Sequence, residues 1–189
     1  MLPEKNNEPA EADNGRWIVE ILFDLIGTVF AAFFAALIVL SLFCRQVTVE
    51  GDSMNDTLHN EERLLVSCWC YEPKCGDIVI VTHGEKLAEP IVKRIIATAG
   101  QTLEIDSQTG DVIVDGVLLK EDYIKGITRT VIDAGEIPRV IPEGYVFVMG
   151  DNRENSLDSR SRRVGLVPVE NIVGKAFMRF FPFDKLSGI

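Results

Sequence analysis

The longest stretch without a formal charge runs from Leu25 to Cys44, twenty residues that are strongly apolar. A helix rises about 1.5 Å per residue, so this stretch matches the roughly 30 Å hydrocarbon core of a bilayer. A core helix of a soluble domain normally shows a polar stripe, and none is visible here. Trp17 precedes the stretch at the position of an interfacial residue. The sequence therefore predicts one transmembrane helix within residues 17–44.

A removable signal peptide is the alternative, because such peptides also contain an apolar helix. Their apolar region usually has about 7–15 residues and follows a basic leader. Here the apolar stretch is longer, and the leader carries the acidic residues Glu4, Glu8, Glu11 and Asp13. No clear cleavage site follows in residues 41–46. We therefore expect a retained helix between a short disordered tail, residues 1–16, and a folded domain, residues 45–189.

Charge and composition narrow the possible functions of that domain. The chain has 29 acidic and 19 basic side chains, a net charge of −10, which argues against a nucleic-acid-binding protein because phosphate contacts need clustered Lys and Arg. With 47% hydrophobic residues, the chain is not disordered as a whole. Residues 45–189 are long enough for one hydrophobic core.

After residue 44 the apolar residues form short, often β-branched runs bounded by Gly, Pro or charged residues, as strands are. Asp115-Gly116 between two apolar runs indicates a hairpin with a type I′ turn. No segment predicts a long amphipathic helix, and residues 126–143 are expected to leave the sheet. We predict a mainly β domain with a partly closed antiparallel sheet. The expected strands are residues 63–70, 77–82, 91–97, 145–149 and 172–181, with a hairpin at 111–120.

The cysteines and histidines give no sign of a metal site. Cys68, Cys70 and Cys75 do not have the spacing of zinc ligands, and no His lies close to them. A disulfide to Cys75 and buried thiols in a strand both stay open, and so does the redox compartment. His59 and His83 are isolated and are expected to be surface residues. We expect neither a metal nor a cofactor.

Lys93 and Arg94 interrupt an otherwise apolar strand. Successive residues of a strand point to opposite faces, so one of these cations points inward unless the strand lies at an edge. Burial lowers the pKa of a lysine, and a neutral amine beside a serine hydroxyl can act as its general base. Two polar segments, residues 51–58 and 150–160, contain candidate serines. Each segment can equally be a solvated turn.

Five motifs, in order, resemble those of the type I signal peptidases, membrane-anchored Ser-Lys endopeptidases that remove signal peptides from exported preproteins. Gly51-Asp-Ser-Met54 is similar to their nucleophile motif, and Lys93-Arg-Ile-Ile96 to their general-base motif. Residues 150–160, which begin Gly150-Asp-Asn-Arg153, are the most specific match. The other two matches are residues 76–81 and 174–177. The resemblance implies a β fold shared with self-cleaving SOS-response repressors.

The resemblance also implies roles for individual residues. Ser53 would be the nucleophile and Lys93 the general base, and the backbone N–H of Ser53 would bind the oxyanion. Ser156 would hydrogen-bond the Lys93 amine and aim it at Ser53. Two ion pairs would hold the surrounding loops: Asp158 with Arg160, and Arg94 with Asp151. The pockets for small substrate side chains would be lined by Val49, Met54, Leu58, Ile91 and Val92.

Three positions depart from the family pattern. Asp56 stands where the family usually has Pro, and Gly51 where some members have a serine that helps bind the oxyanion. Thr98-Ala-Gly-Gln101 replaces a usual Leu-Pro-Gly-Asp run. No chemistry is expected of Asp56 or of residues 98–101, and with Gly51 the oxyanion would have to be bound by backbone N–H groups. Activity is therefore expected to be retained, with Asp56 holding its turn through a hydrogen bond from a backbone N–H to its carboxylate.

The resemblance finally implies a location and partners. The protein would cross the cell membrane once, with residues 1–16 cytoplasmic and the catalytic domain extracytoplasmic. Its partners would be the signal peptides of exported preproteins and the lipid bilayer. Self-cleavage is a second possible activity, disfavoured by the apolar stretch and the lack of a DNA-binding half. A non-enzymatic, membrane-tethered β module is a third, and the presence of both Ser53 and Lys93 argues against it.

Overall fold

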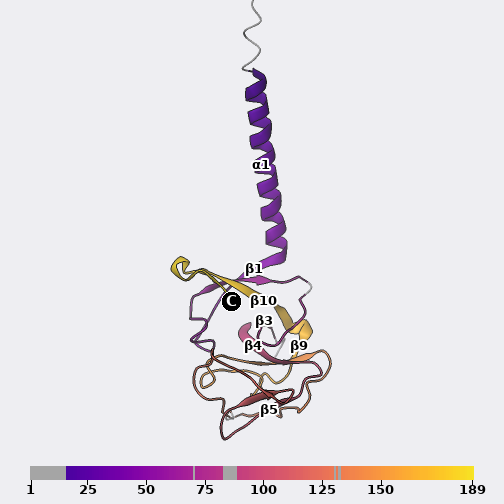
Figure 1. Cartoon of the computed structure of the whole chain (residues 1–189), viewed down its shortest axis with the longest axis vertical. Coiled ribbons are helices and arrows are strands. Elements are labelled where there is room, and N and C mark those ends of the chain that lie inside the picture. Colours follow the sequence, from indigo (N-terminus) through magenta and orange to yellow (C-terminus); the bar gives the residue numbers. More distant parts are fainter. Residues whose placement is uncertain (1–15, 70, 83–88, 130, 132) are drawn as a thin grey trace, which may run out of the picture. The chain divides into compact units, whose positions relative to one another are not determined.

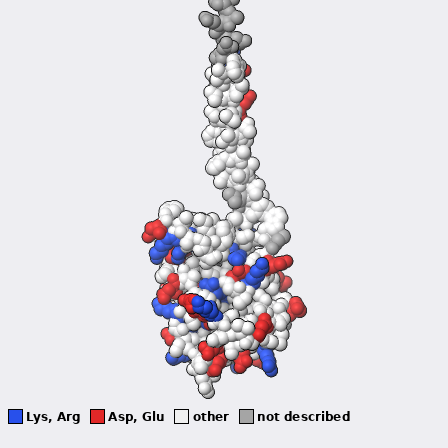
Figure 2. All heavy atoms as spheres, viewed as in Figure 1, with Lys and Arg blue, Asp and Glu red and all other residues white. Residues whose placement is uncertain are grey.

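The computed structural model describes residues 16–69, 71–82, 89–129, 131 and 133–189. The described chain divides into two units, a helical one that ends at Leu42 and a β domain from Phe43 to Ile189. The helix, α1, spans Arg16–Phe43 and by length and composition can cross a bilayer. Figure 2 shows few charged side chains on α1, whereas acidic and basic side chains are interspersed over the visible face of the β domain.

The β domain is built on an eight-stranded antiparallel sheet. Seven strands follow the order β1-β2-β10-β3-β4-β8-β9, and β11 pairs with β10. A second sheet contains β5, β6 and β7, and Figure 1 shows it at the opposite end of the domain from β1. The strands of the large sheet are β1 (Cys44–Thr48), β2 (Arg63–Ser67), β3 (Ile78–Val81), β4 (Ile91–Thr98), β8 (Tyr145–Met149), β9 (Val167–Pro168), β10 (Ile172–Phe181) and β11 (Ser187–Gly188). The small sheet has β5 (Leu103–Ile105), β6 (Val112–Val114) and β7 (Val117–Leu118).

This architecture confirms the predicted fold class, a mainly antiparallel β domain after one N-terminal apolar helix. Every expected strand is present, and the hairpin turns at Asp115 and Gly116, which both have positive φ. Among the described residues the other helical elements are single 3-10 turns, η2 (Val169–Asn171) and η3 (Phe183–Lys185). Residues 126–143 contain no strand in their described part.

The structure also contains short strands that the sequence pattern did not indicate: β1, β5, β9 and β11. The last three have only two or three residues, too few for an alternation to be recognised. β1 begins directly after the helix, where Arg45 and Gln46 are exposed. Its strand conformation comes from antiparallel pairing with β2 and not from a buried apolar face.

Three clusters of buried apolar side chains form the core of the β domain. One of them joins Val49, Met54 and Leu58 to side chains of β2 and β3.

Cys44, Cys68 and Cys75 carry free thiols, and Cys70 lies outside the described residues.

Candidate active site

Ser53 lies in the polar turn that connects β1 to β2, and apolar side chains of the turn anchor it to the core. Met54 and Leu58 are buried in the core, and Leu58 N donates to Met54 O at 2.8 Å. Gly51 has a φ of +81°, a left-handed conformation that favours glycine, and its N–H donates to Asn60 Oδ1 at 2.8 Å. The sequence therefore presents the Ser53 hydroxyl on a rigid turn.

Lys93 lies on β4 and is only 2% exposed. Its Nζ is 2.6 Å from Ser53 Oγ and 2.8 Å from Val92 O. Burial lowers the pKa of Lys93 to about 8, although the charges of Asp158 and Asp151 oppose this shift. The cation that points inward from this strand is therefore Lys93, and it contacts a serine hydroxyl.

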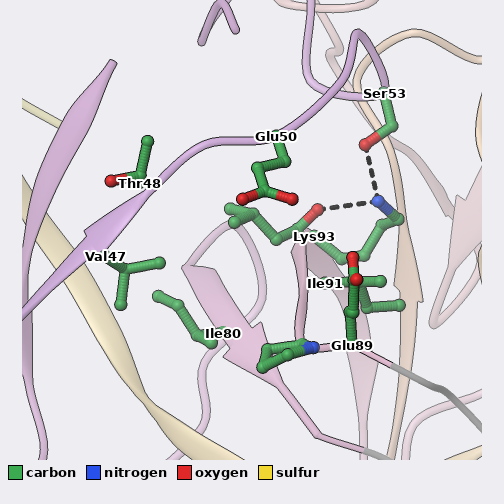
Figure 3. A pocket seen from close by; sticks show the side chains of 10 residues that line it. Val47, Thr48, Glu50, Ser53, Ile80, Glu89, Ile91 and Lys93 are labelled. Atoms are coloured by element: carbon green, nitrogen blue, oxygen red, sulfur yellow. Dashed lines mark hydrogen bonds between the residues drawn. The ribbon is translucent and has the colours of Figure 1, made fainter. Parts of the chain in front are cut away.

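A cavity of about 500 Å³ opens beside this pair (Figure 3). Ser53 and Lys93 lie at one side of it, and Val47, Ile80 and Ile91 supply apolar walls. The rest of the lining comprises Thr48, Glu50, Glu89, Pro90 and Val92. β4 pairs with β3 along Ile91–Arg94 but with β8 only from Arg94 onward. In the described chain, one edge of Ile91–Lys93 is thus left without a strand partner.

The segment from Gly150 to Arg160 contributes to two buried ion pairs around Ser53 and Lys93. Arg94 makes a two-pronged contact with Asp151, at 2.8 Å from Nε and 2.6 Å from Nη2. Asp158 and Arg160 are paired at 2.8 Å and are both almost fully buried. Burial alone would raise the pKa of Asp158, but the hydrogen bonds and the charge of Arg160 outweigh burial and hold this pKa below its usual range. Both pairs thus join the residues that the sequence analysis expected to pair.

Ser156 lies close to the Ser53–Lys93 pair, but it does not form the expected hydrogen bond with Lys93. Its Oγ is buried and makes no hydrogen bond of good geometry among the described residues, although it helps to hold down the pKa of Asp158. The second oxygen that accepts from the Lys93 amine is Val92 O. The Ser53 N–H donates to no group in the described part of the chain, so it is available to a ligand.

Of the five residues expected to line substrate pockets, the structure places two at the cavity. Ile91 and Val92 line it. Val49, Met54 and Leu58 are at most 2% exposed and point into the core beneath the nucleophile turn. The apolar walls come instead from Val47 and Ile80, for which the sequence predicted no role in a pocket.

Other residues hold the site together and were not singled out by the sequence analysis. Asn152 donates from its backbone N to Ser53 O and from Nδ2 to Asp52 O, both at 3.0 Å. Thr57 Oγ1 donates to Asp151 Oδ2 at 2.5 Å. From the segment after β7, Glu121 pairs with Arg153 and Tyr123 covers Arg94, and nothing in their local sequence pattern signals these contacts. The described residues contain no group of three His, Cys, Asp or Glu side chains that could hold a metal ion.

A serine hydroxyl in contact with a buried amine of lowered pKa can act as a nucleophile. An adjacent cavity with a free strand edge can receive an extended peptide. The arrangement is thus suited to acyl transfer from a peptide.

Comparisons with the sequences of known proteins point in the same direction. A family model described as "Signal peptidase, peptidase S26" matches residues 22–181. Signal peptidase I T of Bacillus subtilis (strain 168) is 37% identical over 163 residues, covering 80% of this chain and 81% of the relative. Signal peptidase I P of Bacillus subtilis subsp. natto is 34% identical over 174 residues, covering 87% and 92%. The crystal structure of a signal peptidase I from Enterococcus faecalis superposes with a TM-score of 0.44 and 27% identity, covering 56% of this chain and 97% of that one.

Proposed function

Because the chain belongs to the signal peptidase family, peptidase S26, and is thus a serine peptidase that removes signal peptides, we propose that Ser53 and Lys93 form its catalytic dyad. The observation that carries this proposal is the 2.6 Å contact between the buried Lys93 amine and Ser53 Oγ. Burial brings the pKa of Lys93 to about 8, so a useful fraction of the amine is neutral near pH 7–8.

The cleavage segment of a preprotein binds in an extended conformation along the free edge of Ile91–Lys93. There its main chain adds to the sheet as a further strand. Small side chains of the segment enter the cavity between Val47 and Ile80, while the scissile carbonyl carbon lies over Ser53 Oγ. The apolar walls favour small, uncharged side chains at the positions that point inward.

Acylation begins when neutral Lys93 takes the proton of the Ser53 hydroxyl as Oγ attacks the carbonyl carbon. The Ser53 N–H, which has no partner in the described chain, stabilises the oxyanion. The C–N bond then breaks, and the Lys93 ammonium gives its proton to the leaving amine. In deacylation a water molecule attacks the acyl carbon and passes its proton to Lys93, which returns a proton to Ser53 Oγ as the ester bond breaks.

The buried ion pairs and Ser156 have supporting roles in this mechanism. The Arg94–Asp151 and Asp158–Arg160 pairs hold β4 and the segment after β8 in a fixed relation to the dyad. Ser156 Oγ, buried and without a well-formed hydrogen bond, is an acceptor for the ammonium that forms on Lys93 during acylation. The additional acceptor would stabilise the charged amine when Ser53 no longer can.

Helix α1 crosses the membrane once, with residues 1–16 cytoplasmic and the β domain extracytoplasmic. The apolar residues of α1 are exposed and extend over more than twenty positions, which supports the proposal that this helix faces lipid. The arrangement keeps the catalytic domain on the side where exported preproteins emerge and raises the local concentration of membrane-bound substrate.

An in vitro cleavage assay tests the catalytic assignment. The full chain in detergent is incubated with a preprotein that carries a small-x-small cleavage site, and the products are identified by mass spectrometry. Ser53→Ala and Lys93→Ala are expected to abolish cleavage with unchanged thermal melting. Ser107→Ala, a change at an exposed serine in the turn between β5 and β6, serves as the matched control and is expected to cleave normally. Normal cleavage by either dyad variant would exclude the dyad.

A further inference from the structure

A buried ion pair links the segment after β7 to the segment that surrounds the dyad. Arg153 has a fully buried side chain, and Glu121, which pairs with it, has a side chain 7% exposed. Arg153 Nη1 donates to Glu121 Oε2 at 2.9 Å and to Thr128 Oγ1 at 2.5 Å. Its Nη2 donates to Glu121 Oε1. The hydroxyl of Tyr123 donates to the same carboxylate at 3.0 Å. The guanidinium of Arg153 is thus held by two residues of one segment, Glu121 and Thr128, and Tyr123 of the same segment bonds to Glu121.

The same Arg153 holds the main chain next to the dyad. Its Nε donates to Gly150 O at 3.1 Å, and its backbone N donates to Lys125 O at 2.9 Å. Lys125 N in turn donates to Asp151 O at 2.8 Å. Residues 150–153 are therefore fixed by both main-chain and side-chain contacts from residues 121–128.

Residues 150–152 pack directly against the nucleophile turn. Asn152 donates two hydrogen bonds to it, to Ser53 O and Asp52 O, both at 3.0 Å. Gly150 lies so close that a Cβ on it would be 2.5 Å from Ser53 O and would also meet Ser156 Oγ. Because this packing leaves no space, a displacement of residues 150–152 must move Ser53.

We propose that Glu121 is a positioning residue for the dyad: by pairing with Arg153 it holds Gly150–Asn152, and through them Ser53, at the distance from Lys93 that the reaction needs. The inference rests on the proposed function of Ser53 and Lys93. Tyr123 assists, because its hydroxyl orients the Glu121 carboxylate while its ring covers Arg94, whose Cζ lies 4.0 Å from the ring centroid. Small errors in the placement of a nucleophile reduce turnover strongly.

The test compares turnover with stability in full-length variants that carry one or two changes. Glu121→Gln leaves the charge of Arg153 unpaired and is expected to lower both Tm and kcat. The double variant Glu121→Leu with Arg153→Met removes both charges, which generally restores stability after loss of a buried pair. It also removes the donor to Gly150 O. We therefore expect its Tm to recover while kcat stays about tenfold or more below wild type, with KM within about twofold.

Two further variants keep the test decisive. Tyr123→Phe loses only one hydroxyl and, if the double variant does not fold, is expected to lower kcat about three- to fivefold. Asp122→Asn is the matched control in the same segment, because its ion pair with Lys120 is exposed to solvent. It is expected to keep wild-type kcat and Tm.

The pH dependence separates positioning from an electrostatic effect. The charged groups that act on the pKa of Lys93 are Asp158 and Asp151, not Glu121. The midpoint of the kcat profile should thus stay within about 0.5 pH unit of wild type in each variant. A larger shift would overturn positioning as the cause. Wild-type kcat in Glu121→Gln or in the recovered double variant would also overturn it. If the double variant does not fold, wild-type kcat in Tyr123→Phe would do so instead. If instead Ser53→Ala or Lys93→Ala stays active, the proposed function itself fails, whatever these variants do.

Discussion

Lys93 Nζ lies 2.6 Å from Ser53 Oγ, although the two residues come from a strand and a turn 40 positions apart. Among the described residues no carboxylate is in hydrogen-bond contact with the amine, and its other acceptor is the carbonyl oxygen of Val92. Burial thus outweighs the more distant acidic charges and keeps the pKa of Lys93 low. In the proposed mechanism, this balance lets a lysine take the role that a histidine has in other serine peptidases.

Removing both members of the dyad should cost little more than removing one. If Ser53 and Lys93 act as a unit, the loss of either abolishes the same step, so the effects of Ser53→Ala and Lys93→Ala are not additive. The measurement is kcat/KM for each single variant and for the double variant. Residual activities that multiply would show that the two residues act independently.

Cleavage should rise with pH through a midpoint near 8. In the proposed mechanism only the neutral amine of Lys93 accepts the proton of Ser53, and burial lowers the pKa of this amine from 10.5 to about 8. Below the midpoint kcat/KM should therefore fall about tenfold per pH unit, and above it the rate should level off. A pH–rate profile with a short peptide substrate measures this. A midpoint near the ordinary value for lysine, or no acidic limb, would contradict the role of Lys93.

Breaking the Asp158–Arg160 pair should destabilise the β domain strongly. Both side chains are at most 3% exposed, so Asp158→Asn leaves a buried guanidinium without its counter-charge. The expected loss in the free energy of unfolding is about 3–5 kcal/mol, measured by denaturant titration. Because the folded-state pKa of Asp158 is lowered, the pair contributes its stability above the unfolded-state pKa and loses it as pH falls through the folded value. Stability of the variant should therefore be less sensitive to acid than that of wild type.

Asp56→Ala should have little effect on either activity or stability. The expected backbone hydrogen bond to the Asp56 carboxylate is absent from the described residues, and its partner is instead Lys125 Nζ at 3.1 Å. Both side chains are more than half exposed, and such pairs contribute about 0–1 kcal/mol. A double-mutant cycle with Lys125→Ala measures the coupling. A hundredfold fall in kcat at unchanged Tm would show that Asp56 takes part in the chemistry.

Deleting residues 1–42 should separate catalysis from membrane attachment. The β domain begins at Phe43 and keeps β1 whole, so the truncated protein is expected to fold and to cleave soluble peptides. Preproteins embedded in lipid vesicles should be processed much more slowly, because enzyme and substrate no longer share a membrane. The exposed aromatic side chains of Trp69 and Phe183 are expected to make its activity sensitive to detergent. Equal rates on embedded preproteins would assign α1 no role in catalysis.

Local pattern in the sequence was sufficient for α1 and the longer strands, and for the inference that either Lys93 or Arg94 points inward from its strand. The uncharged stretch predicted α1, and short apolar runs predicted strands such as β4, because side-chain periodicity records which face of an element is buried. The partners Ser53 and Lys93 were identified through family-like motifs. Their contact spans distant parts of the chain, and no periodicity encodes such a pairing.

Only the tertiary structure decided how the surroundings of the dyad are built. It turned Val49, Met54 and Leu58 into the core and gave the cavity walls to Val47 and Ile80. It left Ser156 without the expected bond to Lys93, paired Asp56 with Lys125, and brought Glu121 to Arg153. Charged and polar side chains find their partners through the packing of segments far apart in sequence. A Glu or Asp within a given local sequence can be either a solvated surface group or half of a buried ion pair. The local sequence therefore does not reveal which of the two it is.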